Sequence, residues 1–225
     1  YNLCIHWQNY VEAPPTISRA LLDPSIAAPF AIAMIVSAFF LTWAVVQVAV
    51  ALGRIIVRTG QVSAMPFVLL LTAVSCQLVA IAGMVVLSQF TGNVSQPLHD
   101  LGSYMLFFGH SFGTSLLGLL VYTQIGVVDL QDTRHIASSN RFLALRKQPR
   151  RAAVVAILGA LFGVTYFGGK FLPDIYFFWQ RTIMIVLEVV VIFSFLGFLV
   201  AFGPFMGFWS RGRKATAHDV VSGSG

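Results

Sequence analysis

The chain has 225 residues, of which 57% are hydrophobic and 10% are charged, and its mean hydropathy is +0.82. Soluble domains carry roughly 25% charged residues, so this composition excludes a water-soluble protein. The formal net charge of +6 does not indicate a nucleic-acid partner, because the basic residues are not interleaved with aromatic residues that stack on bases.

Five apolar runs follow one another along the chain, and a helix needs about 20 such residues to cross a bilayer. They cover Ala27–Leu52, Met65–Phe90, Leu101–Tyr122, Ala152–Gly168 and Tyr176–Phe202. None alternates apolar and polar residues as the strands of a membrane barrel do. We therefore predict an all-α polytopic transmembrane bundle of five spans within residues 27–205. An outer segment, residues 1–28, precedes it and a cytosolic tail, residues 206–225, follows it.

Lysine and arginine are divided unevenly between the two ends of these predicted spans. Eleven of the 14 fall in alternate connections and in the tail, whereas the other side has only Arg19, Lys170 and Arg181. Cytosolic loops carry the excess of Lys and Arg in membrane proteins. We therefore predict an N-terminus that is outside or lumenal and a C-terminus in the cytosol, in the plasma membrane or an endomembrane.

Among the polar residues deep within the predicted spans, Gln77, His110 and Glu188 stand out. At 1.5 Å per residue, His110 lies about 14 Å and Glu188 about 18 Å from the start of its run, near the middle of the hydrocarbon. Gln77 has a similar depth, so we predict one polar cluster inside the bundle. Such a cluster either fixes helix packing through hydrogen bonds or forms a polar pocket or proton-sensitive switch.

A second set of polar residues is predicted at the outer face. His99 and Asp100 precede the third span, and Arg181 enters the fifth. A histidine with a carboxylate and an arginine is suited to hydrolysis or acyl transfer at a lipid headgroup, so these three are the catalytic candidates. The alternative is structural: Asp100 caps a helix N-terminus and Arg181 stands at headgroup level.

The connection between the third and fourth spans mixes basic with apolar residues. Contact with anionic lipid headgroups is one interpretation of its basic residues, and orientation of the chain alone is the other. The residues concerned are Arg141, Arg146, Lys147, Arg150 and Arg151. Membrane lipids and other membrane-protein subunits are the expected partners. Neither metal nor cofactor is expected, because His110 is the single histidine deep in a span and no enzyme motif such as G-x-S-x-G or H-E-x-x-H occurs.

Several short motifs follow one another along the chain: Pro15-Thr16-Ile17-Ser18, Pro24 and Pro29 before a span, His99-Asp100 opening a later span, and Glu188 in the last one. Their order resembles the damage-regulated autophagy modulator family, which includes the FRAG and SFK-type proteins and relatives in GPI-anchor lipid remodelling. The family usually has six spans, with the first before the Pro-x-Ile-Ser loop. The resemblance therefore implies that this chain lacks that first helix.

Two functions are consistent with these observations. One is a regulator or accessory subunit that recruits partners or organises lipids, and the resemblance places it in membrane traffic, autophagy or phosphoinositide-related processes. The alternative is a membrane-embedded lipid-modifying enzyme of the GPI-anchor remodelling type, with His99 and Asp100 as acid and base and Arg181 on a headgroup phosphate. A transporter is disfavoured, because the spans carry few charges and no interruptions.

The uneven distribution of Lys and Arg gives a test of orientation. Single cysteines introduced into residues 91–100 should react with a membrane-impermeant thiol reagent in intact cells, whereas cysteines in residues 141–151 should react only after permeabilisation. Labelling of the 141–151 segment from outside would show that the predicted orientation is wrong.

Overall fold

The computed structural model describes residues 24–58, 63–90, 94–130, 146–168 and 177–202. They form five α-helices: α3 (Pro24–Arg58), α4 (Met65–Gln89), α5 (Gln96–Leu130), α8 (Gln148–Gly168) and α9 (Phe177–Val200). No strand occurs among these residues, which confirms the all-α prediction. Residues 1–23 of the predicted outer segment and the whole predicted tail lie outside the described residues.

Four of the described helices are long and apolar enough to cross a membrane, along Ser25–Val57, Met65–Gln89, Gln96–Gln124 and Thr182–Val200. Helices satisfy their backbone hydrogen bonds internally, as hydrocarbon requires. α8 contains the predicted fourth span but is not among these four, since polar and charged residues occupy its first turn. The chain is therefore an integral membrane protein.

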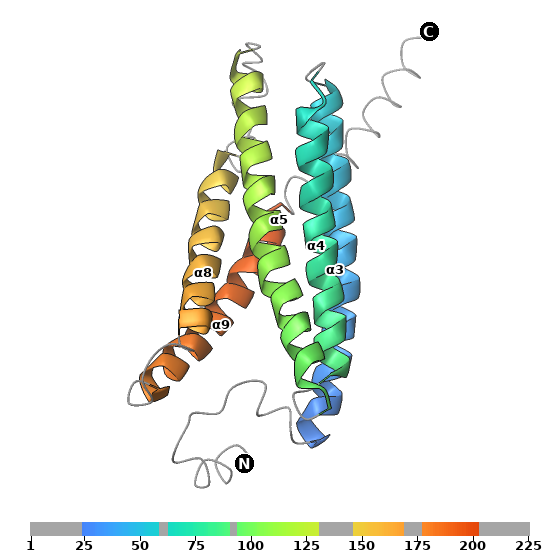
Figure 1. Cartoon of the computed structure of the whole chain (residues 1–225). Helices are drawn as coiled ribbons and strands as arrows, with labels where there is room; N and C mark the ends of the chain where they lie inside the picture. Colours follow the sequence, from blue (N-terminus) through green and yellow to red (C-terminus); the bar gives the residue numbers. More distant parts are fainter. Residues whose placement is uncertain (1–23, 59–62, 91–93, 131–145, 169–176, 203–225) are drawn as a thin grey trace.

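Each helix packs against the one before it in the chain (Figure 1). α3 lies beside α4, α4 packs on α5, and α5 packs on α8. α9 packs on α8, and it crosses at an angle so that its C-terminal end also reaches α5. This order follows from chain connectivity, because consecutive elements usually lie next to each other. It makes α5 the central helix, with α4 on one side and α8 on the other.

α4 and α5 approach each other closely at glycines on both helices. A Cβ added to Gly83 would lie 2.7 Å from the carbonyl oxygen of Gly102, and one added to Gly109 would lie 2.8 Å from that of Cys76. Such distances leave no room for a side chain. Membrane helices pack through small residues in this way, because the helix backbones can then make direct van der Waals contact.

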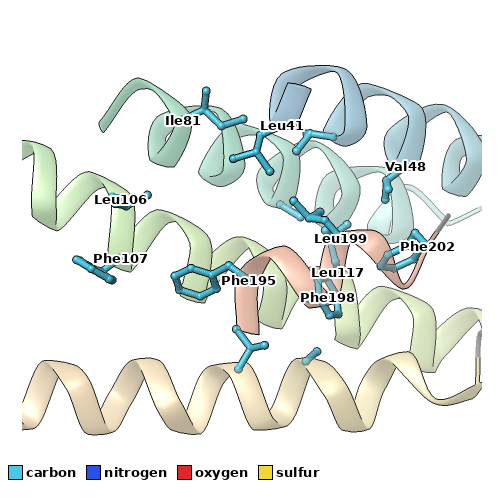
Figure 2. Packing of buried hydrophobic residues seen from close by; sticks show 14 of the residues in the cluster. Leu41, Val48, Ile81, Leu106, Phe107, Leu117, Phe195, Phe198, Leu199 and Phe202 are labelled. Atoms are coloured by element: carbon cyan, nitrogen blue, oxygen red, sulfur yellow. The ribbon is translucent and has the colours of Figure 1, made fainter. Parts of the chain in front are cut away.

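The interior contains large apolar side chains, many of them from the C-terminal half of α9. Figure 2 shows Phe195, Phe198 and Leu199 along this helix and Phe202 just after it, in one cluster with Leu117 of α5. Large apolar side chains also cover the outside of the bundle, for example Phe39, Phe40 and Trp43 of α3. In water such a surface would drive aggregation, whereas in a bilayer it contacts lipid.

Because α4 and α5 are in close contact, a single methyl group added at their interface should lower the stability of the protein. Gly83→Ala should lower the free energy of unfolding by about 1–3 kcal/mol, because its Cβ would meet backbone atoms that cannot move aside. Gly53→Ala on α3 is the matched control, since its Cβ would lie an ordinary 3.7 Å from Leu70 and should change stability by less than about 1 kcal/mol. Thermal unfolding of both variants in detergent makes the comparison, and equal stability would contradict the packing described.

Candidate functional site

The predicted acid/base pair lies where α4 ends and α5 begins, and His99 holds this turn together. Its side chain is 8% exposed, and its Nδ1–H donates to the carbonyl oxygen of Phe90 at 3.2 Å. Phe90 is the C-terminal capping residue of α4. His99 therefore satisfies one of the carbonyl groups that a helix leaves unpaired at its C-terminus.

The prediction that Asp100 caps the helix N-terminus is wrong. α5 begins at Gln96, and no acidic residue stands in its first turn. Asp100 lies one turn inside the helix and accepts a hydrogen bond from Nε2 of Gln96 at 2.8 Å. The helix begins five residues before the apolar run that starts at Leu101, and its first turn carries polar residues suited to the membrane interface.

The third catalytic candidate is not placed beside this pair. Arg181 belongs to α9, whose side chains are described only from Thr182 onward. The arrangement of His99, Asp100 and Arg181 around one substrate therefore stays a prediction.

The deepest polar site lies between α4 and α5, halfway along both helices. Gln77, His110 and Thr114 are 0%, 3% and 1% exposed. Nδ1–H of His110 donates to Oε1 of Gln77, and Nε2 of Gln77 donates to Oγ1 of Thr114 at 3.2 Å. An amide oxygen only accepts hydrogen bonds, so this contact places the proton of a neutral His110 on Nδ1. Both ends of the Gln77 amide are thus paired with α5.

Glycine at position 113 makes room for the Gln77 amide. A Cβ at Gly113 would lie 2.9 Å from both Cγ and Nε2 of Gln77. Thr114 was not among the predicted cluster residues, although its position four residues after His110 places both on one face of α5. That spacing is the signal by which Thr114 could have been found.

Glu188 does not join this cluster as predicted. The α9 residue that packs on His110 is Phe195, whose ring centroid lies 4.8 Å from that of the imidazole. Glu188 stands two turns earlier, about 10 Å along the helix axis, and the hydrogen bonds described for Gln77 and His110 do not include it. α9 crosses the bundle at an angle (Figure 1). The same number of residues from the start of a helix therefore does not give the same depth in the membrane.

The predicted lipid-headgroup residues gather at the start of α8. Arg146, Lys147, Arg150 and Arg151 are all exposed, while Arg141 lies outside the described residues. Two of them, Arg150 and Arg151, line a groove of about 640 Å³ between α8 and α9. The groove was not predicted, because it depends on how two helices cross and not on either sequence alone.

One buried side chain ties the two helices together at this end. Nε2 of Gln148, at the start of α8, donates to the carbonyl oxygen of Ala201 at 2.9 Å. Ala201 also lines the groove, so this bond sets the spacing between the helices at its edge. In the described part of the chain, no group of three His, Cys, Asp or Glu residues is placed to hold a metal ion.

The buried cluster predicts a measurable coupling between α4 and α5. Gln77→Leu should lower the free energy of unfolding by about 1–3 kcal/mol, because it leaves the His110 N–H without its acceptor. His110→Phe and the double variant complete a cycle whose coupling energy should be about 0.6–1.7 kcal/mol, as for other buried pairs in membrane bundles. Thr72→Val is the control on α4, since this hydroxyl bonds Val68 within its own helix. Additive effects of Gln77→Leu and His110→Phe would contradict the cluster.

Comparison of the chain with protein-family models, with curated proteins and with solved structures finds no match. The sequence and structure establish an integral membrane bundle with a buried polar cluster. A histidine that bonds the end of α4 lies at one end of the bundle, and a groove with two arginines lies at the other.

Proposed function

We propose that this protein is a non-enzymatic membrane regulator or accessory subunit that organises lipids or recruits membrane partners. The observation that carries the proposal is the position of His99. A general base must come within about 2.6–3.2 Å of the proton that it removes. The His99 ring is buried, its bond to Phe90 holds it against the end of α4, and His99 is not part of the lining of the groove. The groove lies beside the first turns of α8, whereas His99 lies in the first turn of α5. These two helix starts are at opposite ends of the bundle (Figure 1).

The exposed basic residues at the start of α8 support an action at the cytosolic leaflet. Anionic lipids attract each Lys or Arg near the surface by about 1 kcal/mol. By the distribution of Lys and Arg along the chain, this end faces the cytosol. Membrane lipids and other membrane subunits are the proposed partners.

The resemblance to the damage-regulated autophagy modulator family supports a role at membranes, for a regulator and for a lipid-modifying enzyme alike. Its members act in membrane traffic, autophagy or phosphoinositide-related processes, and we extend these settings to this chain as part of the proposal. The support consists of the order of short motifs, among them His99-Asp100 and Glu188.

Substitution of His99 separates the regulator from the enzyme. His99→Ala should destabilise the protein by about 1–3 kcal/mol through the lost bond to Phe90. Asp100→Asn should change stability by less than about 0.5 kcal/mol, because a surface pair four residues apart contributes little. Wild type and both variants, reconstituted in vesicles, should leave the lipid composition unchanged by mass spectrometry over the same period.

An enzyme would give the opposite pattern. Wild-type protein would convert a phospholipid or a glycosylphosphatidylinositol in these vesicles, and both variants would lose this turnover while they remain folded and inserted. That outcome would replace the regulator with the lipid-modifying enzyme.

A further inference from the structure

The groove between the first turns of α8 and the last turns of α9 has a volume of about 640 Å³ and a mostly apolar lining. Val154 and Val155 contribute from α8, and Phe198 and Val200 contribute from α9. The space is open at Gly197, because a Cβ built on this residue meets no atom within 4 Å. The groove is therefore a slot that has room for an apolar chain.

Positive charge is concentrated on the α8 side of this slot. Arg150 and Arg151 both line the groove and are both exposed. Asp100 and Glu188, the carboxylates whose side chains the structure describes, are not part of the lining. An arginine fork matches the oxygen atoms of a phosphate and bonds two of them at once. The charge of the groove therefore complements a phosphate group.

The surrounding medium limits what kind of molecule meets both features. Gly197 and Val200 belong to an apolar segment long enough to cross the hydrocarbon, and Val200 is 73% exposed, so this part of the slot faces acyl chains. The arginines stand in the first turn of α8, where the positive end of the helix dipole also favours an anion. A molecule with acyl chains and an anionic phosphate satisfies both parts.

We propose that this groove binds an anionic diacyl phospholipid, with its phosphate between Arg150 and Arg151 and one acyl chain along Val154, Gly197 and Val200. The inference rests on the proposed function for the orientation of α8 and deepens it, because it names the lipid class and the residues that select it.

The charged part is tested by native mass spectrometry of the purified protein with phosphatidylserine and with phosphatidylcholine of the same acyl chains. Arg150→Gln/Arg151→Gln should weaken phosphatidylserine binding roughly thirtyfold, because the charge-assisted hydrogen bonds of two arginines to the phosphate are lost. Arg146→Gln/Lys147→Gln is the matched control, since it removes the same charge from the same end without touching the lining of the groove. The control should weaken binding by less than about threefold, because these charges lie outside the groove and solvent ions screen them.

The apolar part is tested separately by Gly197→Leu, which fills the slot without a change in charge. Binding of both lipids should fall, while the melting temperature stays near that of the wild type because the new Cβ meets no atom within 4 Å and the groove beside it is open. Glycerophosphoserine, which has the headgroup and no acyl chains, should not compete with phosphatidylserine.

Several results would overturn the proposal. Equal losses in the two double variants would show attraction to the surface charge alone, and unchanged binding by Gly197→Leu would remove the acyl chain from the slot. Equal binding of the two lipids by the wild type would show that the groove does not select an anionic lipid. Competition by glycerophosphoserine would show that the acyl chains are not needed for binding. The comparison of the two lipids and the competition by glycerophosphoserine use the wild-type protein, so they test the proposal even where a double variant fails to fold. Lipid turnover by the wild type would contradict the proposed function and leave the binding result standing, so the two failures are distinguishable.

Discussion

The close contact between α4 and α5 is the interaction on which the rest of the bundle depends. Lipid tails are as apolar as Leu, so helices in a bilayer are not driven together by the hydrophobic effect and associate through van der Waals contact and hydrogen bonds. Gly83 and Gly109 bring the two backbones together, and Gly113 leaves the volume that the Gln77 amide fills. With one face of α5 fixed in this way, its other face is left for α8, and α8 in turn positions α9.

Much of the fold could be predicted from the sequence, because the length of an apolar run and the side on which basic residues fall are properties of the chain itself. The contents of the interior could not be predicted equally well. Gln77 and His110 share a depth and do meet, but depth says nothing about the direction in which a helix face points. Glu188 was placed with them by depth alone, and the tilt of α9 brings Phe195 to His110 instead.

The pair at the outer end shows a different limit of the sequence. His99 and Asp100 look equivalent as candidates, since both precede an apolar run. In the structure α5 begins earlier, so that His99 faces the end of α4 and Asp100 bonds within its own helix. One residue of rotation on a helix is about 100°, which is enough to separate a buried structural side chain from a surface one. The boundary of the helix decides the roles of both residues, and apolar periodicity does not locate that boundary.

The buried cluster and the groove contact the same short stretch of α9. Phe195 packs on the ring of His110, and Gly197 and Phe198 line the groove less than one turn later. A helix interior moves as a unit over such a distance, because its backbone hydrogen bonds link each residue to the one four positions away. A change in the position of α9 at the groove therefore also changes the contact between Phe195 and the hydrogen-bonded imidazole. Within one turn, α9 thus joins the wall of the groove to the hydrogen-bonded pair between α4 and α5.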